Sequence, residues 1–162
     1  MERIGNRFPK RKGNSSGFTL IEMLFVIALV AILVAIAIPL FREFRERAQV
    51  AAAIAGIKVI EQAVVSHFIS TDAYPDSLSE VGFESMRDPW GNPYQYTRIN
   101  VPGKNMIGKA RKDRFLVPIN TDFDLYSMGP DGVSATPLTA KASQDDIIRA
   151  NDGGYIGRAA GY

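Results

Sequence analysis

The chain has 162 residues with no cysteine and a single histidine, His67. The lack of cysteine excludes disulfides, catalytic thiols and cysteine-based zinc sites. The sequence also lacks a phosphate-binding P-loop and any Cys/His pair that would supply a nucleophile and its base. His67 follows a helical pattern beside Phe68, where packing or exposure is more common than catalysis. We therefore do not expect an enzyme.

The basic residues are concentrated near the N-terminus. Five of the 19 Lys and Arg residues precede Gly17, against one acidic residue, Glu2. The remainder carries fourteen basic and sixteen acidic residues, so nucleic-acid binding is not expected. Positive flanks of a membrane span stay in the cytoplasm, which would place the C-terminal part in the periplasm or outside the cell. The five basic residues are Arg3, Arg7, Lys10, Arg11 and Lys12.

A long apolar segment follows this leader. Met23 to Leu40 comprises 18 residues without a charge, and Pro39 is its one helix breaker. Counted from Phe18, the segment is long enough to cross a hydrocarbon core of about 30 Å as a helix. It has no polar face, and the rest of the chain has no second apolar segment of this size to bury it. The pattern predicts a single membrane-spanning helix.

Two simpler interpretations account for less of the pattern. A cleavable secretory signal would explain the basic leader and the small residues 35–37, but its apolar region usually spans only about 7–15 residues. A plain membrane anchor would explain the length but not Glu22. A carboxylate inside an apolar segment is costly and is therefore a candidate functional group.

The sequence GFTLIE at residues 17–22, followed by an apolar helix with Pro39, resembles the prepilin signature of type IV pilins and type II secretion pseudopilins. The resemblance implies cleavage between Gly17 and Phe18 by a prepilin peptidase and N-methylation of Phe18. It also implies a filament of many copies, in which Glu22 pairs with the amino terminus of a neighbouring Phe18. Family members use the region of Pro39 as a flexible joint.

The pattern changes after the apolar segment. A charged collar at residues 42–47 is expected to be a solvated face with local ion pairs. Apolar residues then recur at helical spacing, so one helix is predicted from Phe18 to about Thr71, roughly 80 Å long. These apolar residues are Ile54, Ile57, Val64 and Phe68.

The remaining residues predict a small antiparallel sheet. Residues 94–98, 115–119 and 124–128 have the aromatic and β-branched content of strands, and the glycine- and lysine-rich loop 101–114 is expected to be exposed. The predicted fold class is α+β: a long N-terminal helix packed on a small antiparallel sheet with a C-terminal loop, a pilin-like fold. The expected parts are a cleaved leader (1–17), an assembly helix (18–41), an amphipathic helix half (42–72) and a small periplasmic domain (73–162).

Two further motifs sharpen the resemblance. DPWGNPY at 88–94 and DLYSMGPDG at 124–132 are similar to the major pseudopilin of type II secretion systems, the G-type subunit. Family members of this type hold their C-terminal loop with calcium instead of a disulfide, and oxygen-rich residues suit that ion. The resemblance implies a ligand set with Asp152 as a competing candidate; the alternative makes these aspartates turn residues. The ligands that the resemblance implies are Leu125, Ser127, Asp131, Asp145 and Asp146.

The resemblance implies a structural subunit of a type II secretion pseudopilus that drives protein export across the outer membrane. Its expected partners are further copies, minor pseudopilins, the prepilin peptidase and an inner-membrane platform with its ATPase. It would span the inner membrane once and then form a periplasmic or surface filament. The alternatives are a type IV pilin or minor pilin of a surface fibre, or a membrane-anchored periplasmic enzyme or binding protein.

Overall fold

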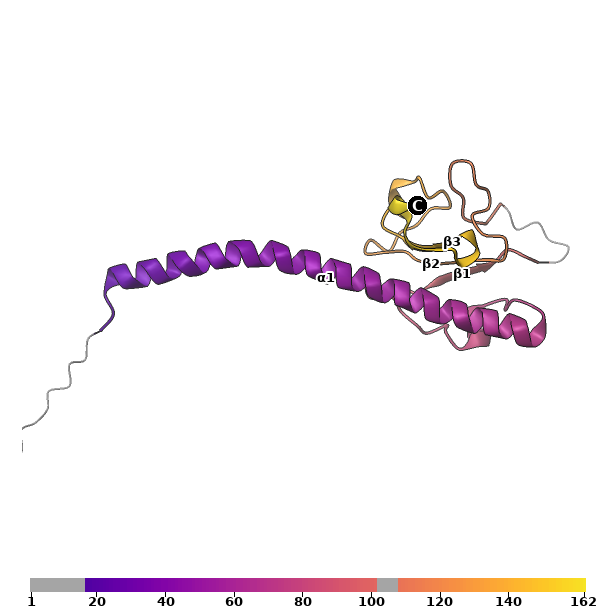
Figure 1. Ribbon diagram of the computed structural model, residues 1–162, viewed down its shortest axis with the longest axis horizontal. Coiled ribbons are helices and arrows are strands. Elements are labelled where there is room, and N and C mark those ends of the chain that lie inside the picture. Colours follow the sequence, from indigo (N-terminus) through magenta and orange to yellow (C-terminus); the bar gives the residue numbers. More distant parts are fainter. Residues whose placement is uncertain (1–16, 102–107) are drawn as a thin grey trace, which may run out of the picture. The chain divides into compact units, whose positions relative to one another are not determined.

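The computed structural model describes residues 17–101 and 108–162. These residues form two compact units, which meet between Arg42 and Glu43. One long helix, α1 (Leu20–Thr71), belongs to both units (Figure 1). Four strands follow it, and short 3₁₀ turns connect them. The predicted α+β fold with a long N-terminal helix and an antiparallel sheet is confirmed. The strands are β1 (Gln95–Arg98), β2 (Phe123–Ser127), β3 (Ile147–Ala150) and β4 (Tyr155–Arg158).

The first unit is the apolar part of α1. All residues from 17 to 48 are exposed, and no side chain in the most apolar stretch of 18 residues is buried. By length and composition this part of α1 is able to cross a membrane. The helix continues through Pro39 without a break. The role of Pro39 as a joint stays a prediction.

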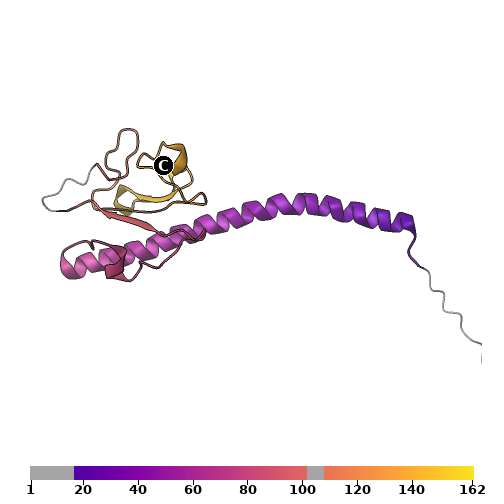
Figure 2. The ribbon, with the colours of Figure 1, turned by 180° about the vertical axis from the view of Figure 1, so that it is seen from behind.

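In the second unit, the C-terminal part of α1 packs on the sheet. The sheet has the order β1-β2-β3-β4 and every pairing is antiparallel. Figures 1 and 2 show the sheet beside the last turns of α1 from opposite sides. In the register, Tyr96 lies opposite Leu125, and Tyr126 lies opposite Ile148.

Apolar side chains cover both faces of the sheet. The face toward α1 holds the main core, in which Phe123, Leu125 and Ile147 pack on the helix. The opposite face holds a smaller cluster that includes Ile148 and Ala150. This division follows from the alternation of side chains along each strand. The helix contributes Ala53, Ile57, Ile60 and Val64 to the main core.

A buried arginine connects the sheet to the helix. The guanidinium of Arg149 on β3 donates to Glu61 of α1 at 2.6 Å and to Asp122 at 2.8 Å, and lies 4.0 Å from the ring centre of Phe123. Burial by itself lowers the pKa of Arg149, but the hydrogen bonds to Asp122 and Glu61 outweigh that effect and raise the pKa. Both carboxylates are thereby neutralised next to the core.

Residues 115–119 are not a strand, and this prediction was wrong. Asp113 and Leu116 exchange two backbone hydrogen bonds in a tight turn, and the Phe115 side chain is 96% exposed. Of the apolar side chains in this segment only Ile119 is buried, in the smaller cluster. Pro118 also lacks the N–H that a ladder needs.

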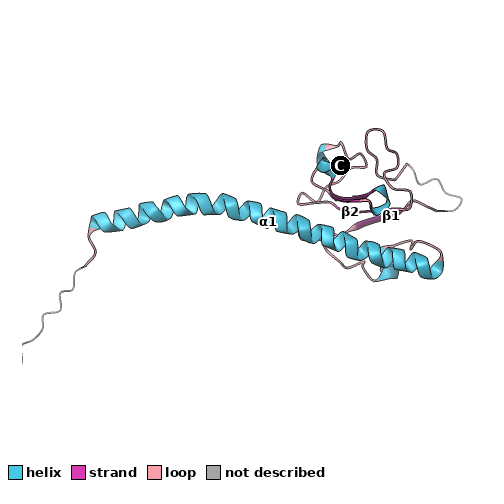
Figure 3. Ribbon diagram, in the orientation of Figure 1, coloured by secondary structure: helices cyan, strands magenta, loops and turns pink. Residues whose placement is uncertain are grey.

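Strands β3 and β4 were not predicted from the sequence. The predicted exposure of the loop 101–114, which lies between β1 and β2, was too high. Most of the described residues between β1 and β3 outside β2 are irregular (Figure 3). In the loop 101–114, residues 102–107 lie outside the described part, but Ala110 and Arg111 are buried. Each missed strand has four residues, and β3 contains the charged Arg149, so neither shows a clear apolar alternation.

Gly56 allows a close approach of Tyr94 to α1. A Cβ atom at this position would overlap with the hydroxyl oxygen of Tyr94, which is buried in the core. Gly56→Ala should lower the free energy of unfolding by about 1–3 kcal/mol, because the added methyl overfills a packed core. Urea unfolding followed by Trp90 fluorescence measures this change.

The control is the same substitution in a Tyr94→Phe background, which removes the hydroxyl. The two changes should be strongly non-additive, and Gly56→Ala should cost less in that background. An equal cost with and without the hydroxyl would contradict the assigned contact.

Candidate functional site

The N-terminus of α1 forms a capping box. The backbone N–H of Thr19 donates to a carboxylate oxygen of Glu22 at 3.4 Å, and the N–H of Glu22 donates to the Thr19 hydroxyl at 3.3 Å. This exchange satisfies two of the free N–H groups at the start of a helix. The pair was not predicted, although Thr-x-x-Glu before an apolar run is its usual signal in a sequence.

The predicted cleavage point lies just before this capping box. Gly17 and Phe18 are exposed, and a Cβ atom on Gly17 would contact nothing within 4 Å. An open backbone without a neighbouring side chain is accessible to a protease. The basic residues of the leader lie outside the described residues. Pairing of Glu22 with Phe18 of another copy is a property of an assembly and stays a prediction.

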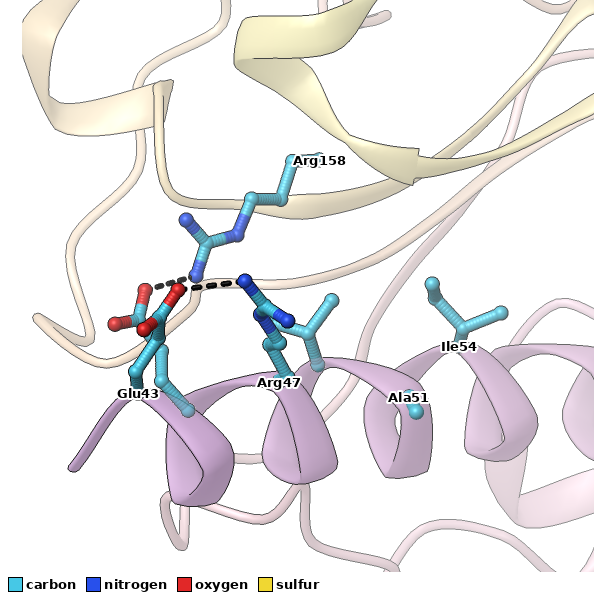
Figure 4. Close-up of a pocket in the computed structure, with 7 residues that line it drawn as sticks. Glu43, Arg47, Ala51, Ile54 and Arg158 are labelled. Carbon is cyan, nitrogen blue, oxygen red and sulfur yellow. Dashed lines mark hydrogen bonds and ion pairs between the residues drawn. The ribbon is translucent and has the colours of Figure 1, made fainter. Parts of the chain in front are cut away.

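The charged collar lines a groove of about 400 Å³ in the second unit. Glu43 and Arg47 pair along α1 at 2.6 Å, and Arg158 at the end of β4 pairs with Glu46 (Figure 4). The predicted local ion pair is therefore present, together with a long-range pair that the sequence pattern did not reveal. The apolar side of the groove consists of Val50, Ala51 and Ile54.

The two motifs that carry the pseudopilin resemblance contact each other. One carboxylate oxygen of Asp88 accepts the backbone N–H groups of Trp90 and Asn92, and the other accepts the hydroxyl of Ser127 at 2.6 Å. The Asn92 side chain donates to the carbonyl of Gly129 at 2.9 Å. The turn at 88–92 thus fixes the end of β2 and the bend that follows. Asp88 and Asn92 are structural residues that the predicted site did not include.

Two of the predicted calcium ligands lie together beyond this bend. The backbone N–H of Asp131 donates to a carboxylate oxygen of Asp145 at 3.4 Å. The Asp131 carboxylate itself accepts the N–H of Val133 at 2.8 Å, as in an Asx turn. Leu125 and Ser127 are both buried in β2, and the Ser127 hydroxyl is already engaged by Asp88.

The remaining two candidates have other partners. Asp146 is fully buried, and one of its oxygens accepts from the Arg111 guanidinium at 2.7 Å and from the Ser134 hydroxyl at 2.6 Å. Burial raises the pKa of the Asp146 carboxyl, while the hydrogen bond from Ser134 and the charge of Arg111 oppose the rise. Asp152 accepts the N–H and the hydroxyl of Thr121 at 2.7 and 2.8 Å, so it belongs to a different turn.

This geometry does not fit a calcium ion held by the full predicted set. One oxygen of Asp146 is held by Arg111, so an ion on the other oxygen would lie close to a fixed positive charge. Within residues 17–101 and 108–162, no three acidic or histidine side chains are arranged to hold a metal. The other oxygen of Asp146 is buried without a partner among these residues, as is the Nε of Arg111.

Comparisons with known proteins identify a motif at the N-terminal end of the chain and several relatives. Residues 12–38 match the family model described as the prokaryotic N-terminal methylation motif. The type IV major pilin protein PilA of Myxococcus xanthus is 42% identical over 91 residues, which cover 56% of this chain and 39% of that pilin. The chain thus spans well under half the length of this relative.

Two relatives share more of the chain's length. The type II secretion system core protein G of Pseudomonas aeruginosa is 29% identical over 145 residues, covering 75% of this chain and 88% of that protein. The protein of the same name from Aeromonas hydrophila is 28% identical, covering 78% of this chain and 90% of its own length. No solved structure matches the chain at a significant level. The chain is therefore similar to type IV pilins in part of its length and to type II secretion system core protein G over most of its length.

Proposed function

We propose that this protein is a structural subunit of a type II secretion pseudopilus. A prepilin peptidase cleaves it after Gly17 and methylates Phe18, and the mature chains polymerise into a helical filament. The filament would drive protein export across the outer membrane. It would assemble from the inner membrane on a platform with an ATPase, together with minor pseudopilins.

The extent of the similarity carries this proposal. The matches to core protein G cover 88% and 90% of those proteins, so they include the sheet domain as well as the helix. The match to the Myxococcus pilin covers only 39% of that protein. An alignment over nearly the whole length supports a common subunit type, whereas a short one supports a common N-terminal helix.

The contact between the two motifs adds support. Asp88 with Ser127, and Asn92 with Gly129, join the segments that resemble the G-type pseudopilin. These segments are about 40 residues apart in the chain, and their contact gives a physical reason for their joint occurrence. These contacts concern the architecture of the sheet domain. The role in export is a proposal.

A type IV pilin is the second candidate. The higher identity, 42%, is to a pilin, and it favours a surface fibre of the type built by that relative. Both candidates require a filament of many copies and differ in where the filament lies. A membrane-anchored enzyme has no support from the relatives described above.

The assembly role of Glu22 can be separated from its role in the capping box. Glu22→Ala should abolish nearly all filament formation, because the amine of Phe18 on the next copy loses its only proposed partner. Thr19→Ala removes the cap at a cost of about 1 kcal/mol to the start of the helix but keeps the carboxylate. This control should retain filaments.

Sheared and membrane fractions, immunoblotted at matched expression, measure the filament yield of both variants. If Thr19→Ala removes filaments as completely as Glu22→Ala, the carboxylate acts only as a helix cap and the assembly role is lost.

A further prediction concerns the location of the fibre. For a pseudopilus, native cells should retain the processed protein in the inner membrane and periplasm, and deletion of the gene should block export of secreted proteins. Fractionation with comparison of the culture medium checks both points. Abundant surface fibres together with unchanged export would favour the type IV pilin.

A further inference from the structure

Among the described residues of the loop 101–114, Arg111 is the one whose charge lies deep in the sheet domain. Only 3% of it is exposed. Its guanidinium contacts Asp146 and Ser134 and lies 4.2 Å from the ring centre of Tyr126. Its backbone N–H donates to the carboxylate of Asp124 at 2.6 Å. The guanidinium is therefore held on three sides by one ion pair, one hydroxyl and one aromatic ring.

These contacts fasten the connection between β2 and β3. Ser134 lies within this connection and Asp146 at its end, immediately before β3. The neighbouring Lys112 accepts a hydrogen bond from Leu138 at 2.9 Å and donates one to Thr136 at 3.2 Å. Residues 111–112 thus bind the connection with both side-chain and backbone groups. It has only one short 3₁₀ turn of its own, residues 141–143, so it depends on such contacts.

The same connection contains the aspartates to which the pseudopilin resemblance assigns calcium. A calcium ion there would neutralise the carboxylates and cross-link the chain on both sides of the connection. The Arg111 guanidinium is a cation that belongs to the chain. It already neutralises Asp146 and links it to the loop before β2. A divalent ion bound to the same carboxylate would lie next to that guanidinium, and the two positive charges would repel each other.

Each member of the Arg111–Asp146 ion pair has one buried atom without a partner among the described residues. These atoms are one acceptor, an oxygen of Asp146, and one donor, the Nε of Arg111. A metal ion would satisfy only the acceptor and would leave the Nε of Arg111 without a partner. Asp131 and Asp145 remain as carboxylates beside each other, and two carboxylates supply only part of the 6–8 oxygens that calcium takes.

We propose that the Arg111 guanidinium takes the place of a structural calcium ion in this protein and holds the connection between β2 and β3 without metal. The ion pair with Asp146, the hydroxyl of Ser134 and the ring of Tyr126 are the parts of this clamp. The inference concerns the stability of the sheet domain and holds for either fibre type.

The test is a set of thermal melts on the full processed chain in detergent, followed by Trp90 fluorescence. With excess EDTA, and with millimolar calcium chloride, the wild-type melting temperature should stay within about 1 °C of its value in plain buffer. Arg111→Gln should lower the melting temperature by about 10 °C, because it leaves Asp146 buried and without its cation. The matched control, Arg114→Gln, changes an exposed arginine of the same loop and should have no effect.

Limited trypsin digestion adds a local readout. Cleavage after Lys141, inside the connection, should be much faster in Arg111→Gln than in Arg114→Gln. A fall of the wild-type melting temperature with EDTA that calcium restores would overturn the proposal, as would equal behaviour of the two variants. If Arg111→Gln does not accumulate, the response of the wild type to EDTA and calcium decides the question alone.

Discussion

The apolar surface of α1 between Leu20 and Leu40 is the constraint from which the proposed biology follows. Every residue of this stretch is exposed, on all sides of the helix. Water does not tolerate so large an apolar surface, so lipid or other copies of the chain must cover it. Glu22 is the one acidic group in this surface, and its only described contact is the cap with Thr19. A weak contact of this kind would leave the carboxylate free to exchange its partner in the proposed filament.

The sheet domain has a small core, and buried ion pairs help to fix its arrangement. Two buried arginines stand on opposite faces of the sheet: Arg149 connects it to Glu61 of α1, and Arg111 connects it to the β2–β3 connection. Buried ion pairs add little stability over apolar packing, but loss of one partner is costly because the other charge stays buried. Such pairs therefore act mainly by making alternative arrangements expensive. In the proposed filament, a sheet domain of fixed shape would keep its contacts with other copies constant.

The sequence predicts those features that depend on local patterns. The end of α1 at Thr71 follows from the helical spacing of its apolar residues, and β1 and β2 follow from their aromatic content. Residues 115–119 have the same content, but only Ile119 packs in a core, and the tertiary structure decides this. Arg149 makes β3 unlike an apolar strand, and its partners Glu61 and Asp122 are distant in the chain. The sequence also did not reveal the partners of two aspartates that the resemblance placed near a metal. Asp146 pairs with Arg111 and Asp152 with Thr121, and both partners are distant in the chain.

The mass of the intact native protein, extracted from membranes of the producing cell, tests the central claim most directly. The claim is that the chain is a processed pilin-type subunit whose helix begins at a new amino terminus next to Glu22. The account predicts a single mature species that comprises residues 18–162 and carries one methyl group on Phe18. A mature protein that keeps the basic leader, or that starts at any other residue, would contradict it.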